Sequence, residues 1–188
     1  MSFGDEYYTL KAKKLGIRAR SYFKLEELDH KFKIIHDNNK ILDLGAAPGS
    51  WIQYCRDKTK KKVSITSVDL KPIEPLNDFL FNHIVENIND ISVNSLGRDY
   101  DVVLSDMAPN TSGIKGQDTY ESYELVLKAF SICKNVLKDK GFFVAKYFQG
   151  EEFQELRNEL KQFFNVLKQF KPKSSRKKSK EIFFIGIR

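Results

Sequence analysis

Short apolar segments alternate with amphipathic segments along most of the chain, and this alternation limits the possible folds more than any other feature. Segments that predict strands cover residues 41–44, 63–69, 81–85, 101–106, 141–147, 164–170 and 181–187. Apolar residues three or four apart predict helices over residues 22–35, 50–56, 119–137 and 153–160. Strands that alternate with helices form a mostly parallel sheet with helices on both faces. Only a basic loop separates the last two strands, so we expect these two to pair antiparallel.

Composition agrees with one α/β domain over residues 1–188, with a basic helical segment at residues 1–35 packed on it. Hydrophobic residues make up 41% of the chain, too many for a disordered protein. No apolar run approaches the roughly 20 residues that span a bilayer, and the first residues are acidic where a signal peptide is basic. Cys55 and Cys133 are too few for a disulfide framework or a zinc site. We therefore expect a cytoplasmic protein without a structural metal.

The net charge of +7 is unevenly distributed. Two segments, residues 7–25 and 171–180, each hold six Lys or Arg residues and no acid, and removing these twelve leaves 20 basic against 25 acidic residues, a net of −5. Clustered positive charge of this kind favours a polyanionic partner over a uniform solubility coat. The alternative is a basic face that contacts only solvent.

A loop of small residues follows the first predicted strand, over residues 45–49, and leads into a helix. Gly45 and Gly49 let the backbone approach a ligand closely, and a helix N-terminus offers free N–H groups. Asp69 ends the second predicted strand, where a carboxylate can accept the hydroxyls of a ribose. The full G-x-G-x-x-G pattern of dinucleotide binders is absent. The loop and Asp69 together indicate a nucleotide-type ligand; without Asp69, an ordinary tight turn would explain the loop.

Four charged residues are candidates for chemistry. Asp106 ends a buried strand, Lys146 lies in an apolar run, Glu181 opens the last strand and Lys24 lies on the first amphipathic helix. A lysine ammonium is costly to bury, and the neutral amine can act as a general base. Taken singly, each residue is better explained by a surface salt bridge or a charge at a strand end, but Lys146 departs most from that explanation because of its apolar surroundings.

Five motifs occur in order along the chain and carry a resemblance to a known family. They are residues 20–25 (RSYFKL), 43–49 (DLGAAPG), 105–110 (SDMAPN), 146–150 (KYFQG) and 173–176 (KSSR). Together they resemble the FtsJ (RrmJ) family of S-adenosylmethionine-dependent RNA 2′-O-methyltransferases. The resemblance covers residues 8–188 and implies a Rossmann-like class I methyltransferase fold: a seven-stranded, mostly parallel sheet with an antiparallel last strand and helices on both faces.

The resemblance also implies roles for individual residues. The family's catalytic Lys-Asp-Lys-Glu tetrad corresponds to Lys24, Asp106, Lys146 and Glu181. Its contacts to S-adenosylmethionine correspond to a set of loop and strand-end residues: Gly45, Gly49, Trp51, Asp69, Asn87 and Asp106. Asn87 stands where the bacterial ribosomal enzymes usually have an Asp that contacts the adenine, and Asp90 is a rival for that contact.

The implied reaction transfers a methyl group to a ribose 2′-hydroxyl, with Lys146 taking the proton if it is neutral or orienting the oxygen if it is charged. The resemblance implies that the two basic segments bind RNA. The expected RNA-binding residues are Lys11, Lys13, Lys14, Arg18, Arg20, Arg176, Lys177 and Lys178. The compact length favours a monomer that acts on a uridine in the A-loop of large-subunit ribosomal RNA. Alternatives are a transfer-RNA ribose methyltransferase, a dinucleotide-dependent oxidoreductase and a non-catalytic RNA-binding module.

Overall fold

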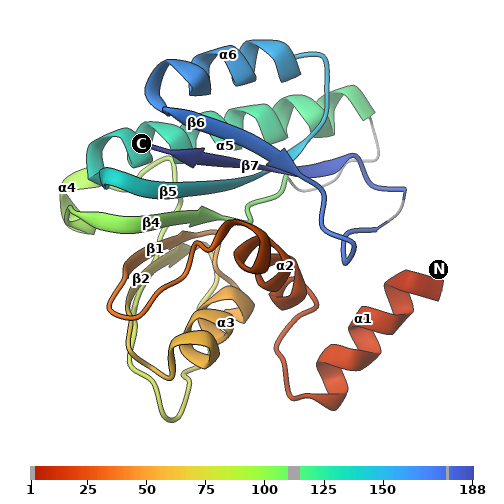
Figure 1. The fold of residues 1–188 in the computed structure, drawn as a ribbon, viewed down its shortest axis with the longest axis vertical. Coiled ribbons are helices and arrows are strands. Elements are labelled where there is room, and N and C mark those ends of the chain that lie inside the picture. Colours follow the sequence, from red (N-terminus) through yellow and green to blue (C-terminus); the bar gives the residue numbers. More distant parts are fainter. Residues whose placement is uncertain (1–2, 110–114, 177) are drawn as a thin grey trace.

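The computed structural model describes residues 3–109, 115–176 and 178–188, and their strands form one seven-stranded sheet (Figure 1). The strands are β1 (Lys40–Leu44), β2 (Ser64–Asp69), β3 (Asn82–Val85), β4 (Tyr100–Ser105), β5 (Leu137–Phe148), β6 (Val166–Phe170) and β7 (Glu181–Ile187). Their order across the sheet is β3-β2-β1-β4-β5-β7-β6. The β1, β2, β3, β4 and β5 pairings are parallel, and β7 is antiparallel to both β5 and β6. The predicted sheet is confirmed, including the antiparallel pairing of the last two strands.

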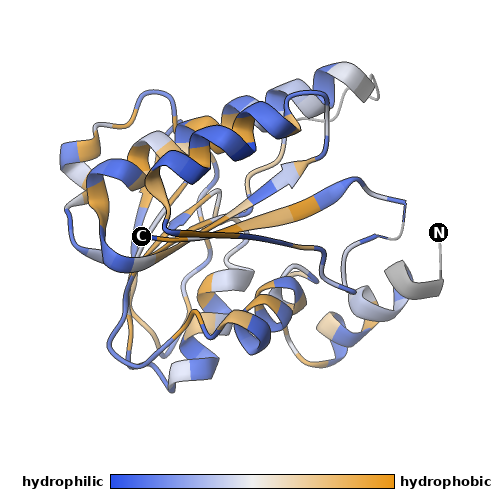
Figure 2. Cartoon of the chain, turned by 45° about the horizontal axis from the view of Figure 1, so that its top comes forward, coloured by the Kyte–Doolittle hydropathy of each residue, from blue (hydrophilic) through white to orange (hydrophobic). Residues whose placement is uncertain are grey.

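Helices cover both faces of this sheet. They are α1 (Phe3–Lys14), α2 (Tyr22–Phe32), α3 (Ser50–Thr59), α4 (Val93–Leu96), α5 (Lys115–Val136) and α6 (Phe153–Phe163). Figure 1 places α5 and α6 on one side and α2 and α3 on the other, with α1 further out beside α2. Figure 2 shows the orange, apolar faces of the helices turned toward the strands. The fold is therefore a three-layered α/β arrangement with two hydrophobic cores.

Successive residues along a strand belong alternately to the two hydrophobic cores, one on each face of the sheet. Residues such as Leu42, Val103 and Phe143 pack with α5 and α6, whereas Ile41, Leu104 and Phe183 pack with α2 and α3. Successive strand residues point to opposite faces, so a residue two positions from a member of the second group also faces α2 and α3. Asp43 on β1, Lys146 on β5 and Glu181 on β7 are each two positions from a residue of this core. The topology thus directs these polar side chains to one face.

Antiparallel pairing also brings β7 to the correct end of the sheet. Phe148, the last residue of β5, pairs with Glu181, the first residue of β7. The start of β7 therefore lies at the same edge as the carboxyl ends of the parallel strands, where open α/β sheets bind their ligands.

Helix α2 is shorter than the spacing predicts. The helix expected to reach Ile35 ends at Phe32, and Lys33 adopts a left-handed conformation with φ 55°. Asp29 Oδ1 accepts the N–H groups of both Ile34 and Ile35 at 2.8 Å, so a side chain replaces the helical carbonyl partners of these two amides. The apolar stripe continues because Ile34 and Ile35 stay buried, but their backbone is no longer helical.

Other boundaries differ from the predicted ones by a few residues: α3 continues to Thr59 and β5 begins at Leu137, whereas β6 begins only at Val166. The short helix α4 is not predicted by the spacing of apolar residues. Nowhere in the described residues does a helix combine the length and the apolar composition needed to cross a membrane.

Candidate active site

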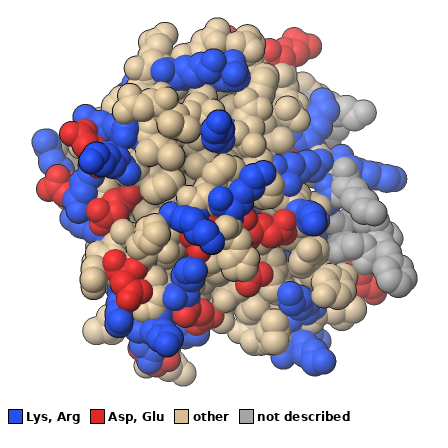
Figure 3. Space-filling view, viewed as in Figure 1, with Lys and Arg blue, Asp and Glu red and all other residues tan. Residues whose placement is uncertain are grey.

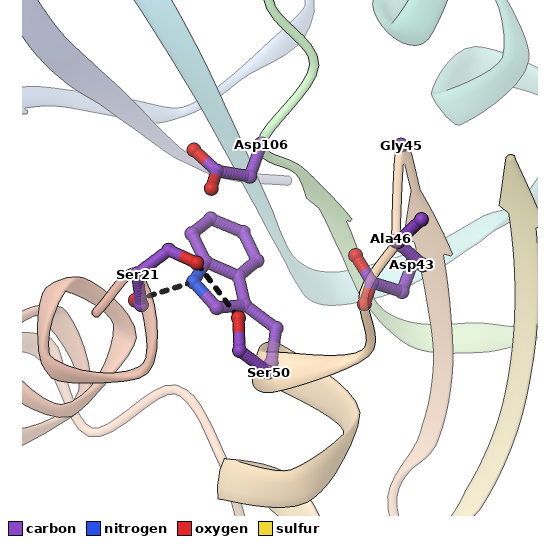
Figure 4. Close-up of a pocket in the computed structure, with 8 residues that line it drawn as sticks. Ser21, Asp43, Gly45, Ala46, Ser50 and Asp106 are labelled. Atoms are coloured by element: carbon purple, nitrogen blue, oxygen red, sulfur yellow. Dashed lines mark hydrogen bonds between the residues drawn. The ribbon is translucent and has the colours of Figure 1, made fainter. Parts of the chain in front are cut away.

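A small pocket lies at the carboxyl ends of β1 and β4, closed on one side by the N-termini of α2 and α3 (Figure 4). It is lined by residues of β1, α3 and the loop after β1, by the residue before α2 and by the residue after β4: Ser21, Asp43, Gly45, Ala46, Ala47, Ser50, Trp51 and Asp106. Ser21 Oγ and Ser50 Oγ are 2.7 Å apart, and Trp51 Nε1 donates to the Ser21 carbonyl at 2.8 Å. These two hydrogen bonds fasten the start of α2 to the start of α3.

Both glycines of the loop are required by its geometry. Gly45 has φ 74°, and a Cβ there would lie 3.1 Å from the Met107 Cα. Gly49 has φ 93° and precedes α3; a Cβ there would lie 2.7 Å from Arg18 Nη1 and 2.9 Å from Ile73 Cγ2. A side chain would be strained at either position by φ and by contact. The glycines therefore allow the loop after β1 to pack against the Met107 loop and the Arg18 side chain.

Asp43 is the most unusual residue of the pocket. It is 1% exposed, and neither carboxylate oxygen has a hydrogen-bond partner among the described residues. Burial raises the pKa of Asp43 well above its usual range, and the nearby carboxylates of Asp106 and Asp69 raise it further. A buried carboxylate without a partner is costly, and a cationic ligand in the pocket would offset that cost.

The four candidate catalytic residues meet beside this pocket. Lys146 Nζ lies 3.1 Å from Asp106 Oδ1 and donates to the Asp106 carbonyl at 2.5 Å. Lys24 Nζ pairs with Glu181 Oε2 at 2.7 Å and lies 4.0 Å from Asp106 Oδ1. Lys24, Lys146 and Glu181 are all buried. Residues 157 positions apart in the sequence thus form one continuous chain of alternating charge.

Other expected cofactor contacts lie at varying distance from the pocket. Trp51 is buried and lines it, whereas Gly49, Asp69 and Asn87 do not. Asp69 accepts the Ala47 N–H at 2.8 Å and the Lys71 N–H at 2.9 Å, and so holds the glycine-containing loop in place. Asn87, just after β3, is half-buried and accepts the Asn89 N–H through its Oδ1 at 2.9 Å. Its rival Asp90 is exposed.

The expected RNA contacts fall into two groups. Four are exposed: Lys13 and Lys14 on α1, and Arg176 and Lys178 in the loop before β7. Figure 3 shows Lys and Arg side chains on the side of the molecule where this loop and α1 lie, and further groups elsewhere on the same face, with acidic side chains among them.

The residues of the second group contact other parts of the protein or are half-buried. Lys11 Nζ lies 4.5 Å from the centre of the Phe23 ring, and Arg20 is half-buried. The remaining expected contact, Lys177, lies outside the described residues. Arg18 donates to three backbone carbonyls, Pro48 at 3.1 Å, Glu74 at 2.5 Å and Pro75 at 2.8 Å. These contacts tie Arg18 to the loop after β1 and to the segment after β2.

Among the described residues, no group of three or more His, Cys, Asp or Glu side chains is arranged to hold a metal ion. Cys55 and Cys133 are buried free thiols, each with its pKa raised by burial. Neither thiol lines the pocket.

A parallel sheet with β7 inserted antiparallel, and a glycine loop and acids at its carboxyl edge, defines a Rossmann-like methyltransferase. The chain belongs to the FtsJ-like methyltransferase family, whose model matches residues 17–188. The structure resembles a crystal structure of a ribosomal RNA methyltransferase from Plasmodium falciparum, with a TM-score of 0.77, 30% identity, and 91% of this chain and 97% of that one covered.

Curated relatives match almost the full length. A protein of Desulfatibacillum aliphaticivorans named Ribosomal RNA large subunit methyltransferase E is 43% identical, over 96% of this chain and 89% of its own. The protein of the same name from Archaeoglobus fulgidus is 42% identical, over 98% of this chain and 96% of its own.

Sequence reasoning missed three residues that the structure connects to the site. Asp43 belongs to the 43–49 motif but has no predicted role, although an acid inside an apolar strand itself indicates a functional residue. Ser21 and Ser50 join the two helix N-termini. Nothing in the pattern of one sequence identifies such a pair, because the contact depends on how α2 packs against α3.

Proposed function

We propose that this protein transfers a methyl group from S-adenosylmethionine to a ribose 2′-hydroxyl of large-subunit ribosomal RNA, and that its target is a uridine of the A-loop. The observation that carries the proposal is the buried Lys24–Glu181 and Lys146–Asp106 chain beside a pocket that holds an unpaired carboxylate. The names of the full-length relatives support the choice of ribosomal RNA.

The residues of the pocket fit S-adenosylmethionine, a ligand with two positive charges. Asp43, whose oxygens lack partners, would accept hydrogen bonds from its ammonium group, and Asp106 would face its sulfonium side. Gly45 and Trp51 shape the wall of the pocket. Asp69 would accept the ribose hydroxyls, because a carboxylate that receives two N–H groups has acceptor capacity left. Asn87 would contact the adenine, as the family pattern implies.

When bound, S-adenosylmethionine supplies an electrophilic methyl group for in-line displacement. Lys146 would hold the 2′-hydroxyl oxygen: as an ammonium it has three donors, one of which goes to the Asp106 carbonyl, while the Asp106 carboxylate is its ion-pair partner at 3.1 Å. A donor that remains would stabilise the negative charge that develops on the oxygen as its proton passes to water. Lys24 and Glu181 would fix the ribose and the position of Asp106. Holding the reacting groups in line then supplies much of the acceleration.

RNA would bind along the exposed cations of α1 and of the loop before β7. Lys13, Lys14, Arg176 and Lys178 are exposed and free to reach phosphates, with Lys11, Arg20 and Lys177 as further candidates. Phosphate contacts of this number give binding a steep dependence on salt. We also propose that the protein acts as a monomer in the cytoplasm.

The test is methyl transfer from labelled S-adenosylmethionine to large ribosomal subunits isolated from cells that lack this modification. We expect labelled 2′-O-methyluridine in the A-loop, and no label in subunits that already carry the modification. Bulk transfer RNA is the parallel substrate. If only transfer RNA is labelled, transfer RNA and not ribosomal RNA is the substrate. If neither RNA is labelled, the proposed function is refuted.

A further inference from the structure

The loop between β6 and β7, residues 171–180, is attached to helix α2 through its backbone. Glu27 on α2 accepts the N–H of Lys173 at 2.6 Å and that of Ser174 at 2.9 Å, one with each carboxylate oxygen. Lys24, one turn earlier on the same helix, pairs with Glu181 at the end of this loop. Helix α2 therefore holds both the backbone of the basic loop and the carboxylate that follows it.

Inside the loop, Ser175 continues the catalytic chain. Its Oγ donates to Glu181 Oε1 at 2.6 Å, while Glu181 Oε2 accepts from Lys24 Nζ at 2.7 Å. Ser175 is 6% exposed and Glu181 is 7% exposed, so both hydrogen bonds are shielded from water. The two oxygens of Glu181 each have a fixed partner, and the carboxylate has little freedom to rotate.

The same short segment faces two ways. Ser174 and Ser175 are buried, whereas Lys173, Arg176 and Lys178 are exposed. The Lys180 carbonyl accepts the Gln149 N–H at 3.1 Å, which attaches the end of the loop to the end of β5. The exposed cations that could bind a phosphate are therefore one to three residues away in the sequence from Ser175, the side chain that holds Glu181.

We propose that Ser175 is a positioning residue: it holds Glu181, and through it Lys24, in the productive geometry, and the anchor at Glu27 keeps the RNA-binding loop in register with this chain. This inference rests on the proposed function and adds a route by which RNA binding at the loop supports catalysis. It assigns a role to a serine that touches neither the cofactor pocket nor, in the proposed reaction, the methyl group.

The neighbouring Ser174 provides a matched control. Its Oγ is buried and has no hydrogen-bond partner among the described residues, so Ser174→Ala removes the same atom without breaking the chain. We expect Ser175→Ala to lower kcat about tenfold with little change in the KM for RNA or the Kd for S-adenosylmethionine, because a hydrogen bond to a buried carboxylate is lost. Ser174→Ala should retain kcat within about twofold, and Ser175→Thr, which keeps the hydroxyl, should recover most of the lost rate.

Three results would overturn the inference: wild-type kcat in Ser175→Ala, an equal loss in Ser174→Ala, or no recovery in Ser175→Thr. Thermal midpoints of all variants establish that each is folded at the assay temperature. If Ser175→Ala does not fold, Ser175→Cys takes its place, because a thiol fills the site but donates only weakly. Failure of the proposed function is distinguishable, since the wild-type protein would then transfer no methyl group to ribosomal subunits.

The anchor at Glu27 is tested separately. Glu27→Gln keeps the shape of the side chain but cannot accept with both ends of its amide, so the Lys173 and Ser174 N–H groups lose one partner. We expect a several-fold rise in the KM for RNA together with a lower kcat. Glu26→Gln removes the same charge from the adjacent position of α2 and should change neither constant by more than about twofold. Equal effects of the two variants would contradict the role of the anchor.

Discussion

Two buried carboxylates on the same face of the sheet, Asp43 on β1 and Glu181 on β7, have opposite surroundings. Asp43 is 1% exposed and has no hydrogen-bond partner in the part of the chain that the structure describes, whereas Glu181 is 7% exposed and receives hydrogen bonds from Lys24 and Ser175. The difference separates two uses of a buried charge. A fully paired carboxylate holds other protein groups in place, while an unpaired one is stable only when a ligand brings the missing positive charge.

The paired side of this comparison gives the largest expected effect. Lys146→Ala removes the group that we propose holds the 2′-hydroxyl oxygen, and we expect kcat to fall about a thousandfold. Binding of S-adenosylmethionine should survive, because Lys146 does not line the pocket. Single-turnover methyl transfer and calorimetric binding measure the two quantities. The exposed Lys161→Ala on α6 is the control; normal turnover by Lys146→Ala would remove it from the catalytic chain.

The unpaired side is tested by Asp43→Asn. The amide keeps the shape but removes the negative charge, and we expect the Kd for S-adenosylmethionine to rise about 50-fold. Asp99→Asn, at an exposed position before β4, should leave binding unchanged. If Asp43→Asn bound the cofactor normally, the unpaired carboxylate would have another purpose.

The raised pKa of Asp43 makes both the stability of the protein and its affinity for the ligand depend on pH. Burial and the carboxylates of Asp106 and Asp69 raise this pKa, so the ligand-free folded protein binds the proton more tightly than the unfolded chain does. The stability of the ligand-free protein should therefore fall as the pH rises from the unfolded pKa to the folded one. At neutral pH, Asp43→Asn avoids this loss, and we expect its thermal midpoint without ligand to be roughly 3–6 °C higher than that of the wild type.

A cationic ligand favours the ionised carboxylate, so its binding should release a proton at pH values below the raised pKa of Asp43. The affinity for S-adenosylmethionine should decrease as the pH falls through that pKa, and Asp43→Asn should lack this dependence. The other groups near Asp43 are Asp69, Asp106 and the Cys55 thiol. Calorimetry in buffers of different ionisation enthalpy measures the proton release.

How far the sequence predicts this molecule depends on the kind of contact. Short apolar segments that alternate with amphipathic segments predict the sheet, because the periodicity of strands and helices is local. The four candidate catalytic residues could be united only through the family resemblance, since Lys24 and Glu181 meet by tertiary packing. The Ser175–Glu181 and Glu27–loop contacts were not predicted, because hydrogen bonds from the side chains and backbone of a loop leave no periodic pattern.

Arg18 is a further residue whose contacts could not be predicted from the sequence, and it lies between the basic segment and the loop after β1. Its place in a basic segment predicts an RNA contact, whereas its guanidinium donates to the carbonyls of Pro48, Glu74 and Pro75 beside the cofactor loop. Arg18→Lys keeps the charge but loses the fork of donors, so we expect the Kd for S-adenosylmethionine to rise about fivefold with an unchanged salt dependence of RNA binding. Lys14→Ala should do the reverse. A normal cofactor affinity in Arg18→Lys would restore its assignment to RNA.

The smallest expected effect concerns the outer side of the basic loop. Replacing Arg176 and Lys178 by Gln removes two exposed cations but leaves the buried Ser175–Glu181–Lys24 chain intact. We expect RNA binding at physiological salt to weaken several-fold, with the slope of log K against log salt reduced by about two for two lost phosphate contacts. With saturating RNA, kcat should stay near that of the wild type, because the chain inside the loop is unchanged. A loss of kcat instead would mean that the exposed cations themselves position the catalytic chain, and that the outer and inner sides of the loop do not act separately.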